Sequence, residues 1–213
     1  MNAKIKRLVY GSFYVAIMWI GTSHSQKTYT LLFAILGIIS MYEMWILRKG
    51  KSKLLAFSYI IIPFIVIQLF GMTDSNYTNL KFYPSIILFM LILTWTFDTF
   101  AYLIGIKFGK HKIMPLISPK KSWEGFAGGF IFTIIISYLS YSYFKFENII
   151  TPLIISIILP FTATIGDFIE SYYKRKAGVK DSGSLIPGHG GILDRMDAFM
   201  ITIPVIYILN QLL

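Results

Sequence analysis

The segment KRKAGVKDSGSLIPGHGGILDRMD, residues 174–197, is densely polar within an otherwise apolar chain. It contains five of the 20 Lys and Arg residues, three acidic residues, one histidine and five glycines. Cationic side chains suit phosphate groups, carboxylates suit a divalent metal ion, and glycines let the backbone approach a ligand closely. We therefore expect the functional site in this segment, and we expect the rest of the chain to place it at a membrane surface.

The composition excludes an ordinary soluble domain. Of the 213 residues, 55% are hydrophobic and only 14% are charged, and this balance is typical of a polytopic integral membrane protein built from helices. The chain contains no cysteine, which excludes disulfides and thiolate chemistry. The net charge of +10 would also suit nucleic-acid binding, but the cations lie in short loops between apolar segments, so we expect no nucleic-acid partner.

Seven apolar segments are long enough, or nearly long enough, to cross a hydrocarbon core of about 30 Å. The first follows a basic N-terminus and could pass for a signal peptide, but no A-x-A-like cleavage site follows it. We therefore predict an all-α fold with about seven transmembrane helices. The predicted spans are 8–22, 29–47, 54–72, 82–106, 124–144, 149–168 and 195–213.

The distribution of Lys and Arg predicts the orientation. If the N-terminus is cytoplasmic and the spans alternate, all of the 20 cations except Lys27, Lys81 and Lys145 face the cytoplasm. Such an asymmetry favours a cytoplasmic N-terminus and an external C-terminus. We predict a single membrane domain, 1–213, in which residues 1–80 form variable, lipid-facing helices and residues 81–213 form the catalytic half.

Five acidic residues stand out because a membrane makes charge costly. Asp98 lies nine residues before Lys107, about 13 Å from the helix end, where a carboxylate costs at least about 2.5–3.5 kcal/mol. It must face the bundle interior, beside a cation, a metal or water. Asp167 with Glu170, and Asp194 with Asp197, form i, i+3 pairs on two helix ends that flank the long loop. These pairs could converge on Mg2+, although Asp197 could also serve as a capping group of its helix.

We expect Asp167 near a helix C-terminus, where the helix dipole opposes a negative charge. This position favours a metal ion or a cationic side chain as its partner. The case for a functional role of Glu43 is weaker, because its carboxylate could pair with Arg48 or reach the membrane surface.

Two cytoplasmic loops are long enough for chemistry, one at 107–123 and one from about Glu170 to Arg195. In the first, Lys120 and Lys121 adjoin Ser122 and precede an expected helix start at Trp123, a natural phosphate site, although membrane anchoring would use the same lysines. Gly125 and Gly129 form a small-xxx-small pair that favours close helix packing.

The long polar segment also resembles a known signature. The pattern S-x-x-K-R-x4-K-D-x-G-x3-P-G-H-G-G-x-x-D-R-x-D, from Ser171 to Asp197, is similar to that of the phosphatidate cytidylyltransferases, also called CDP-diacylglycerol synthases. Segments 95–102, 108–112, 118–125 and 166–171 resemble the same family. The resemblance is strong from Trp95 to the C-terminus and faint before it, and it predicts an N-terminally shortened member.

The resemblance implies an enzyme that converts CTP and phosphatidic acid to CDP-diacylglycerol and pyrophosphate in phospholipid biosynthesis. It implies a bacterial inner membrane location with the site facing the cytoplasm, a Mg2+ ion, a second, monovalent cation such as K+, and a homodimer. We assign the metal to Asp167 and Asp194. The residues assigned to catalysis are Asp98, Lys174, Arg175, Lys180, Asp181, His189, Arg195 and Asp197. The residues assigned to substrate binding are Lys120, Lys121, Ser122, Glu124, Ser171, Gly188, Gly190 and Gly191.

Four other functions fit parts of the pattern. A CTP-dependent lipid or polyprenol kinase would need a similar basic, metal-binding loop. A CDP-alcohol phosphotransferase fits poorly, because its D-G-x2-A-R…G-x3-D-x3-D pattern is absent. A transporter with Asp98 on an ion path leaves the polar loop unexplained, and an inactive shortened relative would act only as a scaffold.

Overall fold

The computed structural model describes residues 3–71, 82, 84–188 and 190–212, without the side chains of residues 3, 4, 6 and 7. Within these ranges the chain forms seven helices and one short β-hairpin. Each of the seven helices overlaps one of the seven predicted apolar segments, which confirms the helical fold. In chain order the elements are α1 (Ala3–Ser23), α2 (Gln26–Leu47), α3 (Leu54–Phe70), α4 (Ser85–Phe108), β1 (Lys112–Met114), β2 (Ser118–Ser122), α5 (Trp123–Ser140), α6 (Ile150–Lys176) and α7 (Leu193–Leu212).

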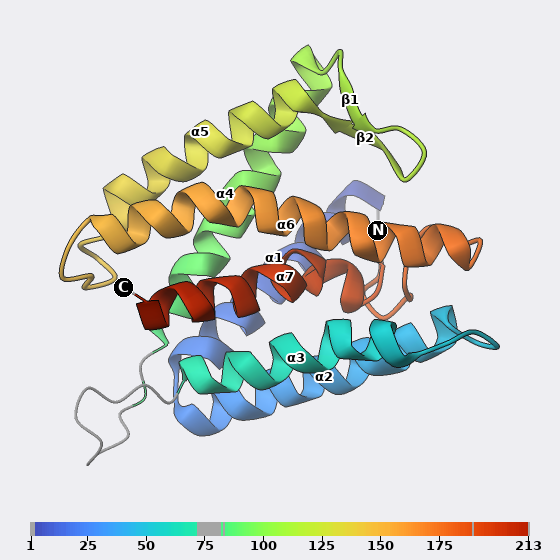
Figure 1. Ribbon diagram of the computed structural model, residues 1–213, viewed down its shortest axis with the longest axis horizontal. Helices are drawn as coiled ribbons and strands as arrows, with labels where there is room; N and C mark the ends of the chain where they lie inside the picture. The colour runs from blue at the N-terminus through green and yellow to red at the C-terminus, as the bar shows by residue number, and fades with distance from the viewer. Residues whose placement is uncertain (1–2, 72–81, 83, 189, 213) are drawn as a thin grey trace.

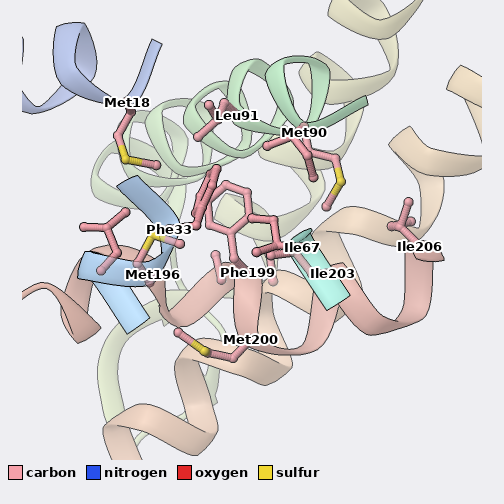
Figure 2. Packing of buried hydrophobic residues seen from close by; sticks show 14 of the residues in the cluster. Met18, Phe33, Ile67, Met90, Leu91, Met196, Phe199, Met200, Ile203 and Ile206 are labelled. Carbon is pink, nitrogen blue, oxygen red and sulfur yellow. The ribbon is translucent and has the colours of Figure 1, made fainter. Parts of the chain in front are cut away.

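Helix α7 lies in the middle of the bundle and packs against α6 on one side and α3 on the other (Figure 1). Its buried side chains recur at helical spacing and include Met196, Phe199 and Ile203, each 2% exposed or less. Figure 2 shows these residues among apolar side chains of the first four helices, such as Phe33 and Met90. The N-terminal helices therefore share one core with the helix that carries Asp194 and Asp197.

The outer surface is apolar, as lipid contact requires. Leu54 is 80% exposed and Ile38 is 71% exposed, and both lie on helices rather than loops. Among the described residues, α2, α4, α5 and α6 are long and apolar enough to cross a membrane, and the apolar parts of α1 and α3 are shorter. The lengths and composition of these helices are consistent with a membrane protein, whereas seven spans and the orientation of the termini stay predictions.

Helix α6 continues past the predicted end of its apolar segment at 168 and reaches Lys176. The extra turns consist of polar residues, and Lys174, Arg175 and Lys176 suit the negative end of the helix dipole. The prediction that the polar loop begins near Glu170 is therefore wrong, because the connector to α7 starts at Ala177. The dipole argument for Asp167 is also wrong, because Asp167 lies more than two turns before the helix end.

The loop 107–123 contains the hairpin β1–β2, in which Lys112 pairs with Ser122 and Met114 pairs with Ser118. The predicted helix start at Trp123 is confirmed. Ser122 is the N-cap of α5, and its Oγ accepts a hydrogen bond of 3.2 Å from the Gly125 amide. The hairpin is therefore mounted directly on the first turn of α5.

The predicted close packing at Gly125 and Gly129 is confirmed. A Cβ at Gly125 would lie 2.6 Å from the Ala101 carbonyl oxygen, and one at Gly129 would lie 2.8 Å from the Phe97 carbonyl oxygen. Both contacts are with the backbone of α4, which cannot move aside like a flexible side chain. These glycines hold α4, the helix that carries Asp98, against α5.

We expect Gly129→Val to lower the free energy of unfolding by about 1–3 kcal/mol, because the added methyl groups force α4 and α5 apart. Thermal unfolding of the purified protein in detergent measures the effect. Ala127→Val on the exposed side of the same helix is the control and should change little. Equal stability of the two variants would show that α4 and α5 do not depend on this contact.

Candidate active site

Three carboxylates from α6 and α7 meet inside the bundle. Asp167, Glu170 and Asp197 each offer an oxygen, and these oxygens all lie within 4.8 Å of one another. Because Gly166 has no side chain, the two helices can approach closely. A Cβ at this position would lie 2.3 Å from the Asp197 carbonyl oxygen. Glu170 is fully buried, and its Oε1 has no hydrogen-bond partner among the described residues. A buried set of carboxylate oxygens with an unused acceptor fits a hard divalent cation.

Two lysines partly neutralise these acids. Lys121 Nζ, from β2, lies 2.7 Å from Asp167 Oδ2. Burial, the largest single effect, lowers the pKa of Lys121, but Asp167, Asp98 and Asp197 together raise this pKa more. The net shift in the pKa of Lys121 is upward, so Lys121 is a cation at neutral pH. Lys174 Nζ pairs with Glu170 and lies 2.7 Å from Asp194 Oδ1. The cluster therefore joins α6 and α7 to the β-hairpin.

Asp194 is engaged differently from the three clustered acids. Its Oδ1 accepts from Lys174 Nζ, and its Oδ2 accepts from the amides of Ser182 and Gly191, each at 2.8 Å. The Ser182 hydroxyl lies 2.9 Å from the same Oδ2. Both oxygens thus have partners: Oδ2 holds the connector between α6 and α7, and Oδ1 pairs with Lys174 of α6. The assignment of the metal to Asp167 with Asp194 stays a prediction, and the geometry favours Glu170 and Asp197 as the companions of Asp167.

Glu43 of α2 holds the same connector from the other side. Its carboxylate is 5% exposed and accepts hydrogen bonds from the Ile192 amide at 3.0 Å and the Leu193 amide at 2.9 Å. The Ser182 hydroxyl, 2.8 Å away, is a third donor. A Cβ at Gly191 would lie 2.4 Å from Glu43 Oε2, which explains a glycine there. Glu43 pairs with none of the described cations, so the expectation of an Arg48 partner or a surface position is wrong.

Two cavities meet at α4, where Asp98 and Tyr102 line both. The smaller, about 580 Å³, lies against the hairpin and α5, and the larger, about 1000 Å³, lies against the connector before α7. Asp98 is within electrostatic range of Lys121 on one side and Arg195 on the other. Polar residues of the smaller cavity include Lys112, Ser118, Lys120, Lys121 and Ser122. Those of the larger cavity include Lys180, Asp181, Ser184 and Arg195, beside Gly188 and Gly190.

Comparison with known proteins decides the family. The model of the cytidylyltransferase family matches residues 2–213. The chain belongs to this family. A phosphatidate cytidylyltransferase of Staphylococcus haemolyticus is 37% identical over 184 residues, which cover 78% of this chain and 71% of that relative. One of Staphylococcus saprophyticus is 41% identical over 167 residues, covering 77% and 63%. One of Rickettsia bellii is 35% identical over 208 residues, covering 94% and 86%.

In this cytidylyltransferase family member, some of the residues assigned to the site from the sequence lie at the carboxylate cluster and others line the two cavities. The structure brings Asp167 and Asp197 together, and it places Asp98 and Arg195 at the adjoining cavities. Arg195 Nε is buried and has no hydrogen-bond partner among the described residues. His189 lies outside the described residues.

Other assigned residues make contacts that position the backbone. Ser122 caps α5, and Glu124 lies 2.6 Å from His111 Nδ1 and accepts from the amides of Lys110 and His111. Arg175 donates to the Val179 carbonyl oxygen at 2.7 Å, and Ser171 is buried within α6. Their assigned roles in substrate binding and catalysis stay predictions.

Three residues of the N-terminal helices reach the site and were not assigned to it. Besides Glu43, the Tyr59 hydroxyl donates to the Gly166 carbonyl oxygen at 2.8 Å, and the Tyr14 hydroxyl approaches the Arg195 carbonyl oxygen at 3.4 Å. These partners lie more than 100 residues away in sequence, so no local pattern could have revealed them.

Proposed function

We propose that this chain is a phosphatidate cytidylyltransferase that makes CDP-diacylglycerol and pyrophosphate from CTP and phosphatidic acid. The observation that supports it most is the meeting of two cation-lined cavities at Asp98, beside a buried group of three carboxylates. Two phosphate-bearing substrates need two adjoining cavities, and their transfer needs positioning and neutralised charge more than covalent help from the protein.

The reaction proceeds by in-line displacement. An oxygen of the phosphatidate phosphate forms a bond to the α-phosphorus of CTP, and the bond from that phosphorus to the β-bridging oxygen breaks. Pyrophosphate leaves with the electron pair. Because a phosphate dianion is already a nucleophile, no general base is required. Lys180 and Arg195 neutralise the triphosphate in the larger cavity, and Lys120 and Lys121 hold the lipid phosphate in the smaller one.

We assign the metal site to Asp167, Glu170 and Asp197, with Asp98 as a further partner, and we propose Mg2+ as the ion. When bound, the ion supplies Lewis-acid stabilisation of the phosphoryl oxygens. Lys121 and Lys174 set the charge around the acids and fix their side chains. We further propose an inner-membrane enzyme with its site facing the cytoplasm, a second, monovalent cation such as K+, and a homodimer, as the sequence resemblance implies.

The position of the transferred phosphorus tests this function. With CTP labelled at the α-phosphorus, the label should pass into the lipid fraction when phosphatidate and Mg2+ are present. With CTP labelled at the γ-phosphorus, the label should stay in water as pyrophosphate. Transfer of the γ-label to a lipid would instead identify a CTP-dependent kinase and contradict the proposal.

A further inference from the structure

The tip of the β-hairpin exposes apolar side chains on a loop rather than on a helix. Leu116 is 94% exposed, more than any other large hydrophobic residue whose exposure the structure describes, and Met114 is 41% exposed. The turn is closed by a hydrogen bond of 3.2 Å from the Ile117 amide to the Met114 carbonyl oxygen. An exposed apolar tip of this kind is typical of a site that contacts a membrane or another protein.

Exposed lysines flank this apolar tip on both sides in the sequence. Residues 107–122 contain no Asp or Glu, and Lys107, Lys110, Lys112 and Lys120 are exposed. An apolar tip flanked by lysines complements the interface of a membrane that contains anionic lipids. A water-facing loop would gain nothing from Leu116, and the surface of a second copy of this chain, with its net charge of +10, is a poor match for these lysines.

Residues of the hairpin line the smaller cavity and contact the carboxylate cluster. Ile113 and Lys120 line the smaller cavity together with the apolar Phe97 and Phe126 of the neighbouring helices. Lys121, on the next position of β2, contacts Asp167 of the carboxylate cluster. This cavity thus combines apolar side chains, which suit the glycerol and upper acyl carbons of a lipid, with lysines, which suit its phosphate.

The hairpin is fixed to the helices at its base. Glu124 accepts from the amides of Lys110 and His111 and lies beside His111 Nδ1, while the Trp123 amide donates to the His111 carbonyl oxygen at 2.9 Å. These contacts attach the base of the hairpin to the first turn of α5.

We propose that the β-hairpin lies in the membrane interface, with Leu116 among the lipids, and forms the entrance through which phosphatidate reaches the cavity lined by Lys120 and Lys121. The identity of the lipid substrate rests on the proposed function. The position of the hairpin does not, and it can be measured without turnover.

The absence of cysteine makes the position of the tip directly measurable. Leu116→Cys, labelled with an environment-sensitive fluorophore, is placed in lipid nanodiscs of phosphatidylcholine with one-fifth phosphatidate. Emission should be shifted to the blue and quenched by lipids that carry a nitroxide near the glycerol. Val179→Cys, an exposed apolar position on the connector after α6, is the control and should report water.

The two remaining outcomes contradict the proposal. Water-like emission at Leu116 would place the tip in solution, and blue-shifted emission without quenching by the lipid nitroxide would mean that protein, such as a second copy of the chain, covers it.

Kinetics then test the role as an entrance. Leu116→Asp should raise the KM for phosphatidate in bilayers by about tenfold, the effect of losing one well-placed apolar contact, and leave the KM for CTP unchanged. Short-chain phosphatidate supplied as monomers should remove the difference, because it does not need to leave a bilayer. An equal defect with both lipid forms, or no defect with either, would overturn the entrance role. Absence of turnover in the unmodified protein would instead count against the proposed function and leave the fluorescence result standing.

Discussion

Asp197→Asn is expected to reduce turnover by roughly a thousand-fold, because a Lewis-acidic metal is worth several kcal/mol and about 1.4 kcal/mol corresponds to a factor of ten. Asp197 contributes one of the three converging oxygens, and asparagine keeps its shape while removing the charge. Asp167→Asn should behave alike. Pyrophosphate release at saturating CTP and phosphatidate measures the loss, and retained activity in either variant would remove that residue from the metal site.

The controls separate loss of metal from loss of structure. Glu147→Gln, at an exposed carboxylate in the connector after α5, should leave activity unchanged. Asp194→Asn distinguishes the two ligand assignments. If Asp194 positions the connector, the variant should unfold at lower temperature while its Mg2+ requirement stays the same. A large increase in the Mg2+ concentration needed for activity, at unchanged stability, would restore Asp194 as a ligand.

Glu43→Ala is expected to lower the free energy of unfolding by about 3 kcal/mol or more, since it leaves buried donors unsatisfied at a cost of about 1–3 kcal/mol each. The amides of Ile192 and Leu193 lose their acceptor, and Ser182 loses one of two. The connector that these residues anchor lines the larger cavity, so we also expect a higher KM for CTP. Thermal unfolding in detergent and CTP titration are the two measurements.

Glu43→Gln is the matched variant, because it keeps the volume and one acceptor oxygen but presents an amide NH2 group to the second backbone donor. Its stability should fall between those of the unmodified protein and Glu43→Ala. If Glu43→Ala matches the unmodified protein in both stability and KM for CTP, the N-terminal helices do not position the connector.

The helical fold was predictable because apolar length alone identifies helices in a membrane. The end of α6 was not, because the boundary was placed where apolar residues stop, at 168, while the helix continues as polar turns to Lys176. The hairpin was missed because a three-residue strand has no periodic pattern. It is held instead by the contact between Glu124 and His111.

The site was predictable in its residue types and less so in its pairings. The spacing of Asp167 and Glu170 correctly placed both on one helix face, and Asp197 joins them across the contact at Gly166. Glu43 carried no usable signal, because its partner Ser182 lies 139 residues away and a buried acid beside Arg48 suggests a local ion pair instead. Long-range hydrogen bonds of this kind depend on the packed bundle rather than on any local pattern.

The most direct test of the proposed function is pyrophosphate release by the purified protein in detergent, with CTP, phosphatidate and Mg2+ supplied together and each omitted in turn. We expect release only when all three are present, loss on chelation of the metal, recovery on its return, and roughly a thousand-fold slower release by Asp197→Asn. Release that persists without phosphatidate, or that survives removal of the metal, would contradict the assignment of two adjoining substrate cavities around a metal-binding cluster.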